Sequence, residues 1–242
     1  MHTKEFSVVI PVYNEEPSVV DNLAKELYLE GFEVIVVNDG GQYKYRRNGV
    51  CVVNHITNVG YGKAIKSGVR ASTRPYIITA DGDGQHTVKE IVRIAKLFSL
   101  IECDMLIGQR RLEYERFIRM FGRKCLNLLA SFFTSRYMLD LNSGLRVFKR
   151  NLAIDYESIL CDTYSYTTSF TISMMTDHYV VEWVPISIAS RSYGKSKVKM
   201  WKDGLITLGL IIKIGGALRT RRLRDWLRRR WIYRVIKHIL GQ

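Results

Sequence analysis

The sequence has few cysteines, and they are far apart. Four occur among 242 residues, at positions 51, 103, 125 and 161. None forms a Cys-x-x-Cys pair, which argues against a structural zinc site and against a disulfide scaffold. Isolated cysteines of this kind are typical of small buried residues in a reducing compartment.

A long uninterrupted apolar run is also missing. The longest, residues 205–218, has fourteen residues and contains Lys213, whereas a membrane-spanning helix needs about twenty. A core helix, a re-entrant segment and an interfacial segment all remain open for it. The sequence starts directly with a strand pattern, so we expect no secretory signal peptide.

Acidic residues are scarce in the last fifty positions. Residues 191–242 hold fifteen Lys and Arg but only Asp203 and Asp225, whereas residues 1–190 hold 22 basic and 21 acidic residues. The sequence therefore predicts a nearly neutral body followed by a basic tail, which we divide into a globular domain, residues 1–200, and a tail, residues 201–242. Such a tail suits a polyanion, either a membrane surface or a nucleic acid.

The pattern of the tail favours a membrane surface. In residues 219–242, arginines separate apolar residues that recur every fourth position, at Leu223, Leu227, Trp231, Val235 and Ile239. Tryptophan and arginine on one amphipathic helix are typical of a membrane interface. A helix packed on its own domain, or on another subunit, is the alternative. Residues 117–133 form a second candidate for an interfacial helix.

Apolar runs alternate with helical spacing over the first 110 residues. This alternation predicts an α/β fold with a largely parallel sheet. The predicted strands are residues 6–12, 32–37, 50–53, 76–80 and 105–107, and the predicted helices are residues 17–28, 62–71 and 87–98.

Polar or glycine-rich segments follow these strands, at residues 11–15, 38–41, 58–62, 81–85 and 108–111. The carboxyl ends of parallel strands meet at one edge of a sheet, where ligands bind in such folds. The sequence therefore predicts an edge built for a polar ligand that carries phosphate.

Asp81 and Asp83 lie one residue apart at the end of a buried-type strand. Two carboxylates at this spacing suit Mg²⁺ or Mn²⁺ with room for phosphate oxygens. Gly82 and Gly84 allow the backbone to bend around such an ion. The alternative is a strand-end turn with two solvated aspartates.

Six segments together resemble the family-2 glycosyltransferases, which have the nucleotide-sugar-binding GT-A fold. The similarity is greatest to the branch that includes dolichyl-phosphate mannose synthase and related polyprenyl-phosphate glycosyltransferases. In order, the segments are residues 9–15 (VIPVYNE), 36–40 (VVNDG), 58–68 (NVGYGKAIKSG), 81–86 (DGDGQH), 140–146 (DLNSGLR) and 191–197 (RSYGKSK).

The resemblance implies a role for each group of residues. The nucleotide-binding residues would be Pro11, Tyr13, Glu15, Asp39, Asn58, Gly60, Gly62 and Asp81. The metal ligands, for Mg²⁺ or Mn²⁺, would be Asp81, Asp83 and Gln85. For Asp39 the alternative is a turn residue, and for the glycines it is a plain turn before a helix. His86 would be an outer partner of the metal group or an ordinary residue before a helix.

The resemblance also implies a set of catalytic and phosphate-binding residues. The catalytic group would be Asp83, Arg110, Arg191 and Lys197, and the acceptor phosphate would contact Arg110, Arg119 and Arg146. Arginine suits a bidentate grip on phosphate, and lysine supplies a compact charge.

The sequence departs from the family pattern at residues 164–175, which contain no Asp or Glu. Many relatives with hydroxyl acceptors carry an acidic general base in this segment. A hydroxyl nucleophile needs a base to take its proton, whereas a phosphate is already anionic. The missing acid therefore favours a phosphate acceptor, although related phosphate-acceptor enzymes can also carry acids here.

We therefore expect an inverting, metal-dependent glycosyltransferase at the cytoplasmic face of a membrane, bound peripherally or monotopically. It would move a sugar from a UDP- or GDP-sugar to a polyprenyl or dolichyl phosphate. Its partners would be these substrates and anionic lipids, without nucleic acid, while a membrane-protein partner or a second copy stays open. The alternatives are a glycan or non-phosphate lipid acceptor, a nucleic-acid-binding protein that uses the arginine-rich tail, and an inactive subunit.

Overall fold

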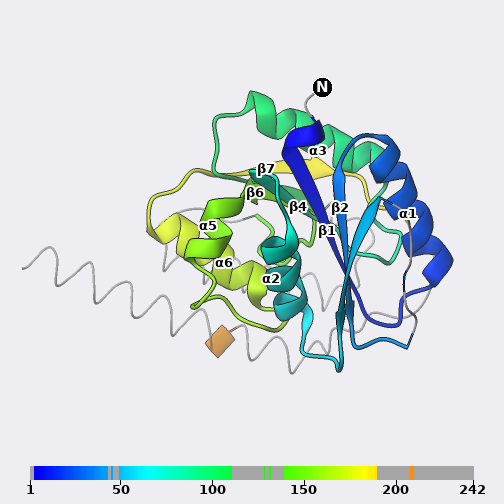
Figure 1. The fold of residues 1–242 in the computed structure, drawn as a ribbon. Coiled ribbons are helices and arrows are strands. Elements are labelled where there is room, and N and C mark those ends of the chain that lie inside the picture. Colours follow the sequence, from blue (N-terminus) through cyan, green and yellow to red (C-terminus); the bar gives the residue numbers. More distant parts are fainter. Residues whose placement is uncertain are drawn as a thin grey trace, which may run out of the picture.

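The computed structural model describes residues 3–42, 45, 49–110, 128, 131, 139–189, 208 and 209. Its centre is a seven-stranded sheet in the order β3-β2-β1-β4-β6-β5-β7 (Figure 1). The strands are β1 (Phe6–Val12), β2 (Glu33–Asp39), β3 (Val50–His55), β4 (Tyr76–Thr79), β5 (Met105–Arg110), β6 (Arg146–Lys149) and β7 (Val181–Ile186).

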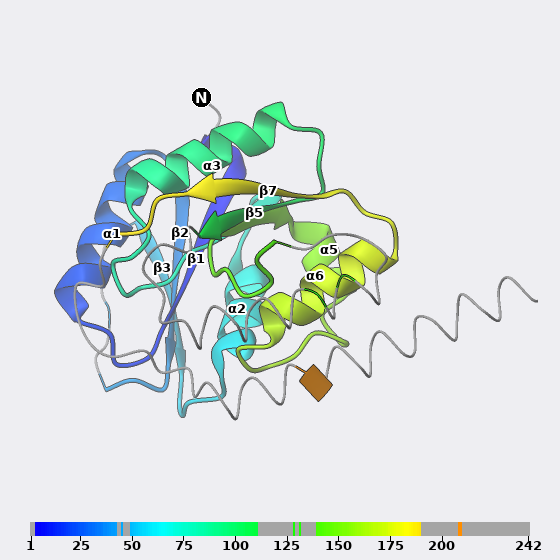
Figure 2. The same cartoon turned by 180° about the vertical axis from the view of Figure 1, so that it is seen from behind.

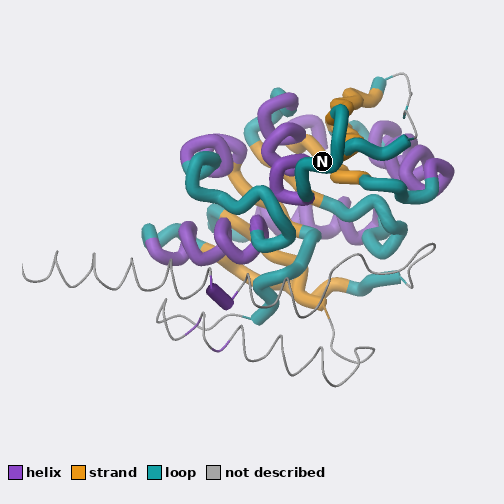
Figure 3. Tube along the Cα trace, turned by 90° about the horizontal axis from the view of Figure 1, so that it is seen from below, coloured by secondary structure: helices purple, strands orange, loops and turns teal. Residues whose placement is uncertain are grey.

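Helices cover both faces of this sheet. Helices α1 and α3 lie on one face, and α2, α5 and α6 lie on the other (Figures 1 and 2). Figure 3 shows the strands between these two helical layers. The helices are η1 (Thr3–Glu5, a 3-10 turn), α1 (Pro17–Leu29), α2 (Tyr61–Ala71), α3 (Val88–Leu100), α5 (Arg150–Asp155) and α6 (Tyr166–Thr176).

Local sequence explains where two of the predicted helices begin and where one of them ends. Pro17 occupies the first turn of α1, where the amide that proline lacks has no intrahelical partner. Thr87 caps α3, because its hydroxyl accepts a hydrogen bond from the amide of Glu90 at 3.3 Å. Gly31 follows α1 with φ +89°, a conformation that favours glycine.

Alternation along the strands divides the core into two clusters. In β1, Val8 and Ile10 belong to the cluster beneath α1 and α3, and Val9 belongs to the cluster beneath α2, α5 and α6. All seven residues of β1 are buried, as expected for a strand with helices on both sides.

The prediction of a largely parallel sheet is confirmed, with one exception that the sequence did not reveal. Strands β1, β2, β3 and β4 pair in parallel, and β5 pairs in parallel with β7. Strand β6, inserted between β4 and β5, is antiparallel to both. Its four residues are too few to show a periodicity, and strand direction has no local sequence signal.

Glu33 is held at the opposite, amino-terminal edge of the sheet. Its carboxylate accepts hydrogen bonds from the Ser7 hydroxyl, from the Thr73 amide at 2.9 Å and from the Thr73 hydroxyl at 2.7 Å. Burial alone would raise the pKa of Glu33, but these hydrogen bonds outweigh it and the pKa is lowered.

Several predictions fall on residues outside the described ranges. They are the roles of Arg119, Arg191 and Lys197, the interfacial helix at 117–133 apart from residues 128 and 131, and the tail from residue 201 onward apart from residues 208 and 209. Within the described part of the chain, no helix combines the length and the apolar character needed to cross a membrane.

Candidate active site

The segments predicted to share one edge of the sheet do meet there. Strands β2, β1 and β4 are parallel neighbours, so their carboxyl ends lie side by side. Because β6 runs the other way, its first residue, Arg146, pairs with Thr79 near the end of β4. The Thr79 hydroxyl also donates to the Gly144 carbonyl oxygen at 2.6 Å. The reversed strand thus brings residues 140–145 to the aspartates that follow β4.

Asp81 is held by three groups from different parts of the chain. The Tyr61 hydroxyl donates a hydrogen bond to Oδ1 of Asp81 at 3.1 Å. Gly144 lies against the carboxylate so closely that a Cβ there would be 2.5 Å from Oδ2. The Asp81 amide donates to Nδ1 of His86, which is only 4% exposed. His86 is therefore a support for the main chain of Asp81.

Tyr61 is a residue that sequence reasoning missed, although it lies inside the Gly-Tyr-Gly motif. Its ring stacks on that of Tyr164, with 5.2 Å between ring centroids and 20° between ring planes. Burial, followed by the negative charge of Asp81, raises the pKa of Tyr61 well above its ordinary value. The hydroxyl therefore stays protonated and can act as a donor to Asp81.

Asp83 and Gln85 form the other half of the predicted metal group. Oδ1 of Asp83 accepts a hydrogen bond from the Gln85 amide at 3.1 Å, which closes the turn after Asp81. The Gln85 carbonyl oxygen accepts from the Ala189 amide at 3.0 Å. The turn is thereby tied to the segment that follows β7.

The donor set at this turn fits a hard divalent cation that is shared with a ligand. Among the described residues, no three His, Cys, Asp or Glu side chains cluster closely enough to hold a metal ion by themselves. The carboxylates of Asp81 and Asp83 and the amide oxygen of Gln85 are hard oxygen donors of the kind that Mg²⁺ and Mn²⁺ take together with substrate phosphates.

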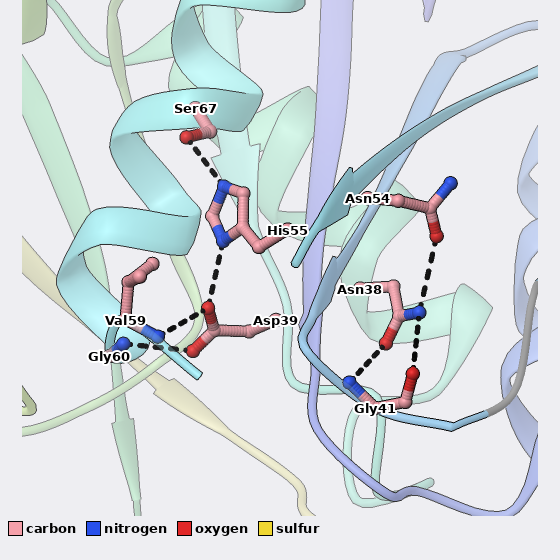
Figure 4. Close-up of polar contacts among 8 residues, drawn as sticks. All are labelled: Asn38, Asp39, Gly41, Asn54, His55, Val59, Gly60 and Ser67. Carbon is pink, nitrogen blue, oxygen red and sulfur yellow. Dashed lines mark hydrogen bonds and ion pairs between the residues drawn. The ribbon is translucent and has the colours of Figure 1, made fainter. Parts of the chain in front are cut away.

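Asp39, at the end of β2, holds the loop of residues 58–62, here called the nucleotide loop. Figure 4 shows its buried carboxylate between the loop and β3. Oδ1 accepts from the Val59 amide at 3.0 Å, and Oδ2 accepts from the Gly60 amide at 2.9 Å. Nδ1 of His55 lies 2.8 Å from Oδ1. The structure thus shows Asp39 organising the loop, and its contact with a nucleotide stays a prediction.

Asn38 points the other way and closes the turn after β2 (Figure 4). Its side-chain oxygen accepts from the Gly41 amide at 3.0 Å, and its side-chain nitrogen donates to the Gly41 carbonyl at 3.2 Å. The same nitrogen donates to the side-chain oxygen of Asn54 at 3.2 Å. An amide side chain suits this place because it both donates and accepts.

Gly60 and Gly62 lack side chains for a reason that the sequence did not suggest. A Cβ on Gly60 would lie 2.5 Å from the Asp162 carbonyl oxygen, and one on Gly62 would lie 2.2 Å from that of Cys161. The amide of Lys63 also donates to the Asp162 carbonyl at 3.1 Å. In the described structure the two glycines therefore admit the main chain of residues 161–163, and their approach to a nucleotide stays a prediction.

Arg110 reaches the same edge from the end of β5 and is held by a buried acid. Its Nε and Nη2 each donate to the Asp140 carboxylate at 2.9 Å, a bidentate pair. The Asp140 side chain is 1% exposed and that of Arg110 is 26% exposed. Arg110 therefore has a fixed guanidinium that is still accessible from one side.

The prediction that Arg146 contacts the acceptor phosphate is corrected by the structure. The side chain is fully buried, and its five N–H donors bond to Leu141, Ser143, Thr167 and Thr171. Burial lowers the pKa of Arg146 to about 10. An arginine with every donor used inside the protein has none left for a phosphate, so Arg146 joins residues 141–143 to α6.

The remaining predicted nucleotide residues lie in or after β1 and before α2. Pro11 is buried within β1, whereas Tyr13 is 37% exposed and Glu15 is half-buried. Asn58 is exposed in the nucleotide loop. The topology therefore places these residues beside Asp39 and Asp81, at the edge where the resemblance expects the nucleotide.

Residues 164–175, the stretch without an acidic side chain, lie mostly in the buried helix α6. Ten of its residues are buried, five of them Thr or Ser. The hydroxyls find partners nearby: Thr168 donates to Asn142 at 2.8 Å, and Thr171 donates to the Thr167 carbonyl at 2.9 Å. The helix thus presents no carboxylate as a general base.

Comparison with known families agrees with this arrangement. Residues 7–156 match the family described as glycosyl transferase family 2. The chain belongs to glycosyl transferase family 2. The match includes Asp39, the nucleotide loop, both aspartates after β4, Arg110 and Asp140.

Individual relatives extend the match beyond this range. The family 2 chain is 30% identical over 207 residues to the uncharacterized protein MJ1222 of Methanocaldococcus jannaschii, which covers 80% of this chain and 85% of that protein. It is 27% identical to the undecaprenyl-phosphate 4-deoxy-4-formamido-L-arabinose transferase of Aeromonas hydrophila and 25% identical to the dodecaprenyl-phosphate galacturonate synthase of Rhizobium johnstonii. These alignments cover 80% and 86% of this chain but only 63% and 65% of the two enzymes.

Solved structures show the same fold. The family 2 chain superposes on glucosyl-3-phosphoglycerate synthase from Mycobacterium tuberculosis with a TM-score of 0.67. The superposition covers 88% of this chain and 79% of that one, at 17% identity. That structure was solved with Mn²⁺, uridine diphosphate and phosphoglyceric acid.

Proposed function

We propose that the protein is an inverting, metal-dependent glycosyltransferase. It transfers a sugar from a nucleotide-sugar donor to a polyprenyl or dolichyl phosphate at the cytoplasmic face of a membrane. The observation that carries this proposal is the fixed Asp81 carboxylate beside Asp83, at the edge where the nucleotide loop and Arg110 also lie.

The nucleotide would bind between the end of β1 and the nucleotide loop. Tyr13 and Glu15 supply an accessible aromatic ring and a carboxylate next to the buried Asp39. Carboxylates suit ribose hydroxyls and base N–H groups as hydrogen-bond acceptors. Since uridine diphosphate is bound in the structural neighbour, a UDP-sugar is the first donor to test, with a GDP-sugar as the second.

Asp81, Asp83 and Gln85 would hold Mg²⁺ or Mn²⁺ against the diphosphate. When bound, such an ion supplies positive charge to the departing nucleoside diphosphate. Tyr61 and Gly144 contribute by fixing the Asp81 carboxylate, so that it does not have to be ordered when the donor binds.

The acceptor half of the proposal rests on α6 and Arg110. An acceptor phosphate oxygen attacks the anomeric carbon and forms the new bond, while the bond to the diphosphate oxygen breaks. No proton has to be removed from an anionic phosphate, which agrees with the acid-free α6. Arg110, which Asp140 orients, would contact this phosphate. Arg119, Arg191 and Lys197 are further cations that we propose for it.

Two of the relatives are named for undecaprenyl phosphate and dodecaprenyl phosphate, which supports a lipid phosphate acceptor here. The basic tail, residues 201–242, would then attach the catalytic body, residues 1–200, to anionic lipid. A screen of donors and acceptors would identify the sugar, the nucleotide base and the lipid length.

The test is transfer by the purified full-length chain with Mn²⁺, a panel of UDP- and GDP-sugars, and polyprenyl phosphate. We expect one donor to yield a glycosylated polyprenyl phosphate together with the nucleoside diphosphate. The matched control is the corresponding polyprenol, which lacks the phosphate. Equal transfer to the polyprenol would overturn the proposed acceptor, and equal transfer in EDTA would overturn the proposed metal.

A further inference from the structure

His55 connects Asp39 to the middle of α2. It ends β3 and lies opposite Asp39 in the register of β2 and β3. Its Nδ1 is 2.8 Å from Oδ1 of Asp39, and its Nε2 is 2.9 Å from the Ser67 hydroxyl oxygen. Figure 4 shows the imidazole between these two side chains. The His55 side chain is 15% exposed and that of Asp39 is 5% exposed.

We call the chain of contacts Asp39–His55–Ser67 the relay. The hydrogen bonds around it show which group donates to Asp39. Both oxygens of Asp39 already accept from amides, one from Val59 and the other from Gly60. A carboxylate can only accept, so Nδ1 of His55 carries the proton between His55 and Asp39, while Nε2 pairs with the Ser67 hydroxyl. Ser67 is carried by α2, whose first two residues, Tyr61 and Gly62, are the last two of the nucleotide loop.

We propose that His55 is a positioning residue for the nucleotide loop, a role that rests on the proposed function. The relay prevents the Asp39 carboxylate from rotating, and so keeps the Val59 and Gly60 amides in place before a nucleotide arrives. A loop that is already ordered does not have to lose conformational freedom on binding, which strengthens binding. His55 lies outside the sequence motifs, and neither His55 nor Ser67 belongs to the predicted site.

Three substitutions separate the parts of the relay. His55→Leu removes both hydrogen bonds, whereas His55→Asn keeps a side-chain N–H that can donate to Asp39. Ser67→Ala removes only the partner of Nε2. Cys51→Ala is the matched control, because Cys51 is an exposed residue on the same strand.

The first measurement is calorimetric binding of UDP and of GDP to the full chain with Mn²⁺. We expect His55→Leu to raise the Kd of the preferred nucleotide about tenfold, and His55→Asn and Ser67→Ala to raise it about threefold. The control should bind as the wild type does. Transfer by His55→Asn at saturating donor should stay near the wild-type rate, so that KM changes and kcat does not. An unchanged Kd in His55→Leu would overturn the inference.

The second measurement needs no nucleotide. Hydrogen exchange at the Val59 and Gly60 amides should be about tenfold faster in His55→Leu, while amides in β1 should exchange as in the wild type. Nitrogen NMR of the wild type should show His55 with its proton on Nδ1. Unchanged exchange, or an Nδ1 without a proton, would contradict the relay. If the wild type binds neither nucleotide, the proposed function fails, and the exchange measurement still decides the role of His55.

Discussion

The hydroxyl of Tyr61 donates a hydrogen bond to Oδ1 of Asp81, across 3.1 Å. Tyr61 begins α2 and Asp81 follows β4, so this bond joins the nucleotide loop to the proposed metal group. The stacked Tyr164 ring and the close packing of residues 161–163 against Gly60 and Gly62 keep Tyr61 in place. Tyr61 therefore connects the nucleotide loop to the proposed metal group and helps to fix both.

Tyr61→Phe removes this hydrogen bond and keeps the stacked ring. We expect the affinity for Mn²⁺ in the presence of UDP to fall about fivefold, since a hydrogen bond of this kind contributes about 1 kcal/mol. Titration of Mn²⁺ followed by calorimetry checks this. Tyr28→Phe, at an exposed position of α1, is the control. Equal affinity in both variants would show that Tyr61 does not position Asp81.

Asp83→Ala should abolish transfer and leave the fold intact. The carboxylate is half-buried in a turn outside both core clusters, and its proposed role is to hold the cation under the diphosphate. We expect a loss of about a hundredfold or more in kcat, with an unchanged circular dichroism spectrum and melting temperature. Wild-type turnover that still requires metal would place the cation on other ligands.

Asp140→Ala should affect both stability and transfer, because it leaves Arg110 without its bidentate partner. We expect a loss of about 1.5–3 kcal/mol in the free energy of unfolding, as for hydrogen bonds to charged groups. Denaturant unfolding measures the stability, and the KM for polyprenyl phosphate reports the position of Arg110. Arg70→Ala, which breaks a pair with Glu157 in which the arginine side chain is 56% exposed, serves as the control and should cost less than 1 kcal/mol. An unchanged KM for polyprenyl phosphate would show that Arg110 does not contact the acceptor.

Glu33 predicts a pH dependence of stability. Its pKa is lowered from 4.5 in the folded chain, so the folded state binds this proton less readily than the unfolded state. The stabilising contribution is present above about pH 4.5 and is lost as pH falls through the folded-state pKa. Glu33→Gln should therefore reduce the acid sensitivity of the melting temperature between pH 5 and pH 3. Parallel melting curves of the two proteins over this range would contradict the assignment.

Removal of residues 219–242 should release much of the protein from anionic liposomes. Each Lys or Arg near such a surface contributes about 1 kcal/mol, so high salt should weaken binding of the full chain in part. Transfer to a short, water-soluble acceptor phosphate should survive the truncation, because the proposed site precedes residue 198. Co-sedimentation at low and high salt is the measurement. Equal sedimentation of both forms would place the anchor elsewhere in the chain.

Much of the fold could be predicted because strand and helix periods are local properties. The run at β1 and the apolar face of α3 show them directly, and each predicted strand or helix up to residue 110 is observed within a few residues. The direction of β6 could not be predicted, because it depends on pairing with Thr79 and neighbouring residues far away in the sequence.

In the candidate site, too, some residues could be predicted from the local sequence and others could not. Asp81 and Asp83 lie one residue apart, so their motif is visible in the sequence. Tyr61, Gly144 and His55 act through contacts across 20, 63 and 16 positions, respectively, which no local pattern records. Arg146 was assigned to a phosphate because its residue type suits one, but only burial shows that its donors are used.

The ion pair between Arg110 and Asp140 has a consequence for how the protein could be altered. Thirty positions separate these residues in the sequence, yet their side chains lie in contact at the active edge. Arg110 ends β5 and Asp140 precedes β6, so the two residues that flank positions 111–139 are fixed against each other. An engineer could exchange that stretch for the equivalent stretch of another family member and keep the donor side unchanged. Under the proposed function, we expect acceptor preference to follow the exchanged stretch and sugar preference to stay with the rest of the chain.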